Sequence, residues 1–263
     1  MIKHIFLDMD GTLLNSSGQV DQRNIDAIIN SEISVTLVSA RAPMEMSTAI
    51  SQLQLRTTQI GFNGGLLFMP NVQGLKIIQD SAIHPADFKT VFDLVETHFP
   101  SVSLSYYDST KWYSKKVDRG IQFEQRLTHQ SPTLINELTP DKTKVYKIMM
   151  IVFDPTVMTK LLAALRALKI DGISIQQSGD LYLEITSRDA KKSHGISQIL
   201  ASEHLDKSET AAFGDGYNDL PMFESVGVPI VMENALPDIK ALGKFVTKSN
   251  DDAGVAYGIQ HFI

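Results

Sequence analysis

A short apolar segment near the start of the chain runs directly into two aspartates and a Gly-Thr turn. Asp8 and Asp10 lie two positions apart, and residues i and i+2 of a strand point to the same side. We therefore expect a buried strand over residues 2–7 whose end directs both carboxylates to one point just beyond the sheet. There one carboxylate can attack as a nucleophile while the other transfers a proton, with a divalent cation holding the pair together.

Strand and helix signals alternate in both terminal parts of the chain. Before residue 63, the elements expected after the first strand are a helix at 21–30, a strand at 34–38, a helix at 43–53 and a strand at 58–62. After residue 186 they are a helix at 193–204, a strand at 210–213, a helix at 221–226 and strands at 229–232 and 245–247. Strands separated by helices predict a parallel α/β sheet.

The middle of the chain has a different pattern, in which strands tend to come in pairs. The expected strands cover residues 102–107, 111–114, 144–153, 173–177 and 181–186, with helices between them. The last two are joined by Gln177-Ser178-Gly179-Asp180, which has the composition of a hairpin turn. We therefore predict a discontinuous α/β core of residues 1–82 and 187–263 and an inserted α+β domain of residues 83–186.

The composition argues against several classes of protein. The formal net charge is −6, whereas nonspecific nucleic-acid binding needs a basic face. The chain contains no cysteine, which excludes disulfides, thiolate metal sites and cysteine nucleophiles. Asp8 and Asp10 interrupt the apolar N-terminus, unlike a signal peptide, and the most apolar later run, residues 146–153, is too short to span a bilayer. We expect a soluble, cytoplasmic protein with no nucleic-acid or membrane partner.

The first strand end carries a recognisable motif. The segment Asp8–Thr12 (DMDGT) resembles the first motif of the haloacid dehalogenase-like superfamily, and specifically that of its phosphatases. The resemblance implies that Asp8 is the nucleophile and that Asp10 is the general acid and base. The dehalogenases lack an aspartate at the position of Asp10 and the transport ATPases carry threonine there, so Asp10 indicates a phosphatase or a phosphomutase. A turn-capping role for both aspartates is the structural alternative.

A second segment, Gly214–Asp219 (GDGYND), resembles the fourth motif of the same superfamily. It follows a short strand, and parallel strands end at one edge of a sheet, where open α/β sheets bind ligands. The resemblance implies that Asp215 binds Mg²⁺ beside the first motif, in an oxygen-only site that suits this ion. It also implies that Asp219 holds a metal-bound water or orients a neighbour, and that Asn218 donates to a phosphate oxygen. Asp219 can alternatively cap the turn.

Two further strand ends resemble superfamily segments. Val38-Ser39-Ala40-Arg41 resembles the second motif, where the superfamily places threonine or serine, although alanine here replaces the usual glycine. The resemblance implies that Ser39 bonds a phosphoryl oxygen; a helix N-cap is the alternative. Arg41 either contacts phosphate or is solvated, and the sequence leaves both open. Asn63–Gly65 resembles the NGA segment of a related subfamily, with a simple turn as the alternative.

The third motif is a lysine near the start of a helix, and the segment Asp189–Gly195 offers two. Alignment of Leu183–Thr186 with the related pattern LEI…sKG places Lys192 in the catalytic position, with Lys191 as the alternative. The resemblance implies that this lysine balances the negative charge of the nucleophile and the phosphoryl group. Ser193 follows where the family usually has glycine, and the other lysine is expected to be a solvated surface charge.

The position of the inserted domain in the sequence indicates which subfamily the chain resembles. Only 31 positions separate Asp8 from Ser39, whereas 153 separate Ser39 from Lys192, so the insertion lies between the second and third motifs. In this superfamily such an insertion is a C2 cap, and its order of helices and strands is similar to the larger α/β variant of the Cof-type sugar phosphatases. The resemblance covers essentially the whole chain and implies a Rossmann-like parallel-sheet core.

The resemblance thus implies a Mg²⁺-dependent phosphomonoester hydrolase that acts on a small phosphorylated metabolite, either a sugar phosphate or a cofactor phosphate, through an aspartyl-phosphate. The implied catalytic residues are Asp8, Asp10 and Lys192; the implied phosphate-binding residues are Ser39, Lys192, Asn218 and Gly11; the implied metal site is Asp8, Asp10 and Asp215, with Asp219 behind them. Two alternatives stay open. One is a phosphohexomutase, similar to the phosphomannomutases, and the other is a noncatalytic metabolite-binding protein.

Overall fold

The computed structural model describes residues 1–72, 74–140 and 142–263. The chain forms two compact units. The core unit consists of Met1–Arg41, Met46–Gln79 and Lys191–Ile263, and the inserted unit consists of Ala42–Glu45 and Asp80–Ala190. Each unit has a sheet of its own, so the two are described separately.

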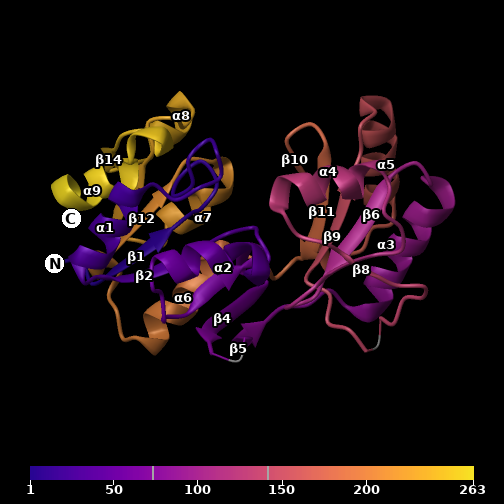
Figure 1. Cartoon of the computed structure of the whole chain (residues 1–263), viewed down its shortest axis with the longest axis horizontal. Helices are drawn as coiled ribbons and strands as arrows, with labels where there is room; N and C mark the ends of the chain where they lie inside the picture. The colour runs from indigo at the N-terminus through magenta and orange to yellow at the C-terminus, as the bar shows by residue number, and fades with distance from the viewer. Residues whose placement is uncertain (73, 141) are drawn as a thin grey trace. The chain divides into compact units, whose positions relative to one another are not determined.

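The core unit is built on a five-stranded parallel sheet with the strand order β14-β13-β12-β1-β2 (Figure 1). Its strands are β1 (His4–Leu7), β2 (Ser34–Leu37), β12 (Thr210–Gly214), β13 (Val228–Val231) and β14 (Phe245–Val246). Every pairing in this sheet is parallel. The expected parallel α/β core is therefore confirmed. Because β1 is fully buried between β2 and β12, the residues that follow it emerge at the carboxyl-terminal sheet edge next to those that follow the central strand β12.

Helices cover both faces of this sheet, as a doubly wound α/β fold requires. They are α1 (Gln22–Ser31), α2 (Pro43–Gln52), α6 (Lys192–Ser202), α7 (Leu220–Phe223), α8 (Pro237–Lys240) and α9 (Gly254–Phe262). On one face Phe6 packs with Ile196 and Ile199 of α6. On the other, α9 lies close enough for Gly258 to contact Phe213. Within the described ranges, no helix is both long and apolar enough to cross a membrane.

The third expected strand does not simply extend the parallel sheet. A separate three-stranded sheet consists of β3 (Gln59–Gly61), β4 (Leu66–Asn71) and β5 (Gly74–Asp80). β3 pairs antiparallel with β4 and touches the parallel sheet through one bridge between Val38 and Ile60. The strand expected at 58–62 is thus present, and its bridge to the parallel sheet is parallel. The antiparallel partner β4 was not expected; the turn Phe62–Gly64, in which all three residues have positive φ, reverses the chain directly into it.

The inserted unit contains a six-stranded sheet with the order β10-β11-β9-β6-β7-β8. Its elements are α3 (Pro85–His98), β6 (Ser103–Tyr107), β7 (Trp112–Ser114), α4 (Arg119–Thr128), β8 (Thr133–Leu134), β9 (Lys147–Ile151), α5 (Pro155–Ala167), β10 (Ile173–Ser178) and β11 (Tyr182–Ser187). The pairings are antiparallel except for β7 with β8. One sheet face packs an apolar core against α3 and α5, with Phe88, Ile148 and Leu161 fully buried.

The opposite face of the same sheet carries charged and polar side chains. Tyr107 and Lys147 are directly paired in the register of β6 and β9, and the Lys147 ammonium lies 4.8 Å from the centre of the Tyr107 ring. Its Nζ is also 3.4 Å from Glu184 on β11. Because successive residues of a strand point to opposite faces, this face also carries the buried Met149 and Ile151 of β9, so polar and apolar side chains lie together on it.

Candidate active site

Three carboxylates converge at the carboxyl-terminal edge of the parallel sheet. Asp8 follows β1, and Asp215 and Asp219 follow β12. One oxygen atom from each of the three lies within 4.8 Å of the others. The strands are adjacent, and the backbone N–H of Asp8 donates to the carbonyl of Phe213 at 3.0 Å. The pairing of two neighbouring parallel strands therefore brings residues 207 positions apart into one acidic cluster.

Lys192 supplies the positive charge of this cluster. It is the first residue of α6 and is 3% exposed. Its Nζ donates to Asp8 Oδ1 at 2.6 Å and to Asp219 Oδ1 at 2.7 Å. Lys191 is exposed and forms the N-cap position of the helix. Of the two adjacent lysines, Lys192 is thus the one whose ammonium contacts the carboxylates.

The cluster carries more negative than positive charge, and the titration behaviour of its members reflects this. Burial raises the pKa of Asp8 well above its ordinary value; the charge of Asp219 raises it further, whereas Lys192 opposes the rise. Burial and Asp219 also raise the pKa of Asp215 to about 6. Burial alone would lower the pKa of Lys192, but the charges of Asp8 and Asp219 outweigh it and raise that pKa. Three carboxylates facing one ammonium can hold a further cation.

The donor set fits a hard divalent cation. Carboxylate oxygens are the ligands that Mg²⁺ prefers. Asp219 is the least available of the three, because its Oδ1 accepts from Lys192 and its Oδ2 accepts from the backbone N–H groups of Asp215 and Gly216 at 3.1 Å each. It therefore orients Lys192 and the Asp215 loop, while Asp8 and Asp215 can offer oxygens to an ion.

The Asp215 side chain is fixed by groups from two other segments of the chain. Thr12 Oγ1 donates to Asp215 Oδ1 at 3.1 Å. Asn234 Nδ2 donates to the carbonyl of Gly11 at 2.8 Å and to Asp215 Oδ2 at 3.4 Å, and Asn234 Oδ1 accepts from the backbone of Asn250 at 3.0 Å. Gly11 has φ +76°, and a Cβ there would collide with the Asp215 carboxylate. The sequence analysis missed Asn234, although it follows the strand expected at 229–232 and so lies at the same sheet edge.

The second motif lies beside the turn that ends β3. Ser39 is 1% exposed, and its Oγ accepts from the backbone N–H of Arg41 at 3.1 Å. The Ser39 carbonyl accepts from the backbone N–H of Asn63 at 2.8 Å. Asn63 has φ 56°, and its Oδ1 is buried without a hydrogen-bond partner among the described residues. Gly64 has φ +101° and packs against the Lys191 backbone, so this turn connects the second motif to the start of α6.

Asp10 and Asn218 lie outside the acidic cluster. The Asp10 side chain is 59% exposed and forms a two-point ion pair with Arg41, whose Nε and Nη2 donate to its two oxygens at 2.9 and 2.6 Å. Asn218 is exposed in the short 3₁₀ turn after β12. The Arg41 guanidinium is therefore not simply solvated, because it binds the carboxylate of the first motif.

A family profile described as haloacid dehalogenase-like hydrolase matches residues 5–259. The chain belongs to the haloacid dehalogenase-like hydrolase family. The match covers the core and the inserted unit together, so this hydrolase resembles its family over both units.

Named relatives of this hydrolase include phosphatases. The Bacillus subtilis protein 5-amino-6-(5-phospho-D-ribitylamino)uracil phosphatase YwtE is 28% identical over 290 residues and is matched over 100% of this chain and 98% of its own length. Phosphatase YwpJ of the same organism is 25% identical over 297 residues, with both chains covered completely. Among solved structures, a haloacid dehalogenase-like hydrolase from Bacteroides thetaiotaomicron superposes with a TM-score of 0.91 at 24% identity over 100% of both chains. That likeness establishes the fold.

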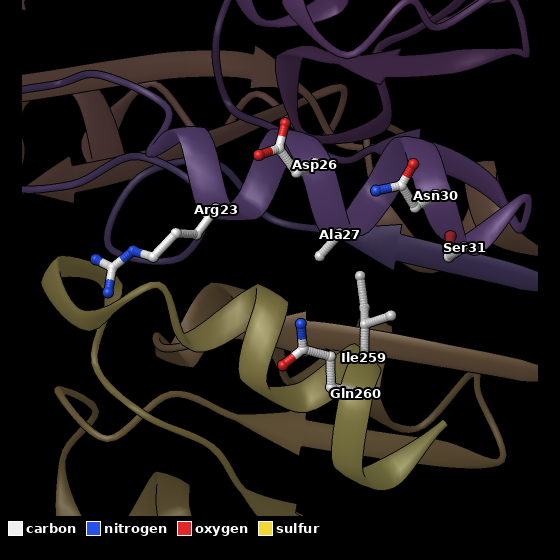
Figure 2. Close-up of a pocket in the computed structure, with 7 residues that line it drawn as sticks. All are labelled: Arg23, Asp26, Ala27, Asn30, Ser31, Ile259 and Gln260. Atoms are coloured by element: carbon white, nitrogen blue, oxygen red, sulfur yellow. The ribbon is translucent and has the colours of Figure 1, made fainter.

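A separate hollow of the core unit is unrelated to the acidic cluster. A groove of about 410 Å³ lies between α1 and α9. Figure 2 shows Arg23 and Asp26 on one of its walls and Ile259 and Gln260 on the other. None of its lining residues belongs to the four motifs. The assignment of the active site of this hydrolase therefore rests on the converging carboxylates and Lys192, not on the size of a cavity.

Proposed function

We propose that this chain is a Mg²⁺-dependent phosphomonoester hydrolase that works through an aspartyl-phosphate on Asp8. One observation carries the proposal: the buried Lys192 ammonium lies between Asp8 and Asp219, with Asp215 beside them, so that the cluster still has a surplus of negative charge. A divalent cation would neutralise this surplus and so allow an anionic phosphoryl group to approach Asp8.

Asp8 and Asp215 would hold the ion, together with a carbonyl of the first motif, and the ion would neutralise charge on the phosphoryl oxygens. In the first step an Asp8 carboxylate oxygen bonds to phosphorus as the bond from phosphorus to the ester oxygen breaks. Asp10 gives its proton to the departing oxygen, which leaves as an alcohol. In the second step Asp10 takes a proton from a water whose oxygen bonds to phosphorus. The bond between phosphorus and Asp8 then breaks, releasing inorganic phosphate and restoring the Asp8 carboxylate.

The remaining motif residues would bind the equatorial phosphoryl oxygens. Lys192, Ser39 and Asn218 offer an ammonium, a hydroxyl and an amide as donors, and the turn at Gly11 can offer a backbone N–H. Positioned donors of this kind supply most of the rate enhancement in phosphoryl transfer. Lys192 has a second role in this scheme, because it keeps the Asp8 carboxylate directed into the site in the absence of substrate.

We also propose that the inserted domain, residues 83–186, is a cap that selects the leaving group. Its insertion between the second and third motifs supports this role, as do the charged and polar side chains on one face of its sheet, where Lys147 lies near Glu184 and where Tyr182 donates to Glu124 at 2.8 Å. Such polar groups suit hydroxyl-rich leaving groups. A closing cap would also exclude bulk water from the phosphoryl transfer.

The names of two relatives support a class of substrate. Two Bacillus subtilis relatives are named for 5-amino-6-(5-phospho-D-ribitylamino)uracil, in which the phosphate is carried by a sugar-alcohol chain. Their identity to this chain is 28% and 24%, which supports a class of substrate and not one compound. We propose small metabolites that carry the phosphate on a sugar, a sugar alcohol or a cofactor.

The test is release of inorganic phosphate from a panel of phosphorylated metabolites, measured with Mg²⁺ and with EDTA, for the wild type and for Asp8→Asn. We expect release that requires Mg²⁺ and is lost in the folded variant. Transfer of phosphate between positions of a sugar without release would instead indicate a mutase. Absence of both reactions in a folded, Mg²⁺-bound protein would contradict the proposal.

A further inference from the structure

The two-point ion pair between Arg41 and Asp10 connects the first and second motifs. Both carboxylate oxygens of Asp10 are engaged, one by Nε at 2.9 Å and one by Nη2 at 2.6 Å. The planar guanidinium matches a carboxylate in this arrangement and so fixes the plane of the carboxylate as well as its position. A lysine would provide only a point charge.

Arg41 is itself held firmly through its backbone. Its N–H donates to Ser39 Oγ at 3.1 Å, and its carbonyl accepts from the N–H of Phe62 at 3.0 Å. A Cβ at Gly61 would lie 3.2 Å from that carbonyl, so β3 passes unusually close to it. The Asp10 side chain, in contrast, is 59% exposed, and Asp10 lies after β1, outside the helices and strands. The guanidinium is therefore the element that orders the Asp10 carboxylate.

We propose that Arg41 is a positioning residue for Asp10, which it directs toward the oxygen of the leaving group; this inference rests on the proposed function. A general acid or base acts only when its oxygen lies within hydrogen-bond reach of the atom that gains or loses the proton. An exposed aspartate without a partner samples several rotamers, and only a fraction of them meets this condition. Arg41 restricts Asp10 to fewer rotamers without touching the substrate.

The test uses a series of phenyl phosphates whose ring substituents make the phenol a progressively better leaving group. A poor leaving group needs a proton as it departs, and a good one leaves as the anion. We expect Arg41→Gln to reduce kcat/KM by about 10- to 100-fold for the poorest leaving group, less than the 10²–10⁴ that general acid–base catalysis supplies in full because Asp10 is still present. For the best leaving group we expect little change, so the dependence of rate on leaving group becomes steeper. Asp10→Asn should steepen it further.

Arg23→Gln is the matched control, because Arg23 forms the same kind of two-point pair with Asp21, at 2.9 and 2.8 Å, in α1. Arg23→Gln should leave kcat/KM unchanged for every ester of the series. Arg41→Lys retains the positive charge but not the two-point geometry of the guanidinium. It should therefore restore kcat/KM for the poorest leaving group only in part. Equal losses by Arg41→Gln on every ester, no loss on any, or complete restoration by Arg41→Lys would each overturn the inference. Failure of the wild type to release phosphate from any of these esters or from the metabolite panel would instead contradict the proposed function.

Discussion

The Lys192 ammonium donates to Asp8 at 2.6 Å across 184 positions of the chain. Both partners are buried, and the contact is made by the first residue of α6 and the first residue after β1. A buried ammonium and carboxylate each lose hydration, which their attraction offsets only in good geometry. Here the same ammonium also donates to Asp219 at 2.7 Å. One lysine therefore holds two of the three carboxylates of the cluster in place.

Replacing Lys192 should therefore affect both activity and stability. Lys192→Gln leaves two buried carboxylates without their ammonium, and removing one partner of a buried pair costs about 3–5 kcal/mol of unfolding free energy. We expect turnover to fall by about 10²–10³ or more, as for loss of one positioned donor. Urea unfolding without Mg²⁺ and phosphate-release assays measure the two effects. Lys191→Gln, at the exposed neighbour, should change neither; similar effects of the two variants would contradict the assignment.

Stabilisation by Mg²⁺ should depend on pH. The pKa of Asp215 is raised from 3.8 to about 6, first by burial and then by Asp219. Between these values the folded protein binds a proton that the unfolded chain has released, so this group makes the metal-free protein less stable as the pH rises. Above about pH 6 the carboxylate is free to bind Mg²⁺. We expect Mg²⁺ to raise Tm clearly at neutral pH and only slightly below about pH 5. Asp215→Asn should remove this difference, and an equal Tm shift at both pH values in the wild type would disprove it.

Asn234 should set the Mg²⁺ requirement without contributing to the chemistry. It donates to Asp215 and to the Gly11 carbonyl, and groups that orient metal ligands typically change metal affinity by about 10- to 100-fold when removed. For Asn234→Ala we expect the Mg²⁺ concentration for half-maximal activity to rise within that range, with kcat at saturating Mg²⁺ largely retained. Asn30→Ala on the exposed side of α1 is the control. An unchanged Mg²⁺ titration of Asn234→Ala would show that this support is dispensable.

Gly64 should be more sensitive to substitution than another glycine with positive φ. At Gly179, φ is +60° and the position is open, so Gly179→Ala should cost only the left-handed conformation, about 1–2 kcal/mol. At Gly64 a Cβ would overlap the Lys191 carbonyl. Gly64→Ala should therefore cost more in thermal or urea unfolding and also reduce kcat, because it displaces the start of α6 and with it Lys192. Equal stability losses in the two variants would contradict a close contact at this turn.

The sequence was sufficient to predict the parts of the site that depend on strand ends. Asp8 and Asp215 follow short apolar strands, and parallel strands end at the same edge, so the convergence of these two carboxylates follows from the fold class. The parallel core and the family resemblance are confirmed. The break in the alternation of strands and helices, where strands come in pairs, is what predicts an inserted domain of residues 83–186.

Other features depend on packing between distant segments, which a local pattern does not encode. β5 was not expected because it is largely exposed and lacks the apolar alternation of a half-buried strand. The pairing of Arg41 with Asp10 joins residues 31 positions apart through a turn whose geometry is set by β3. Asn234 was missed for the same reason, since its role becomes visible only when the loop after β13 is placed against Asp215.

The central claim is that Asp8 forms a covalent bond to phosphorus, and the stereochemistry of the reaction tests it directly. A thiophosphate ester made chiral at phosphorus with oxygen isotopes can be hydrolysed in isotopically labelled water. Each in-line displacement inverts the configuration, so transfer to Asp8 followed by transfer to water predicts net retention. Net inversion would mean that water attacks the ester in a single displacement, and would contradict Asp8 as the nucleophile.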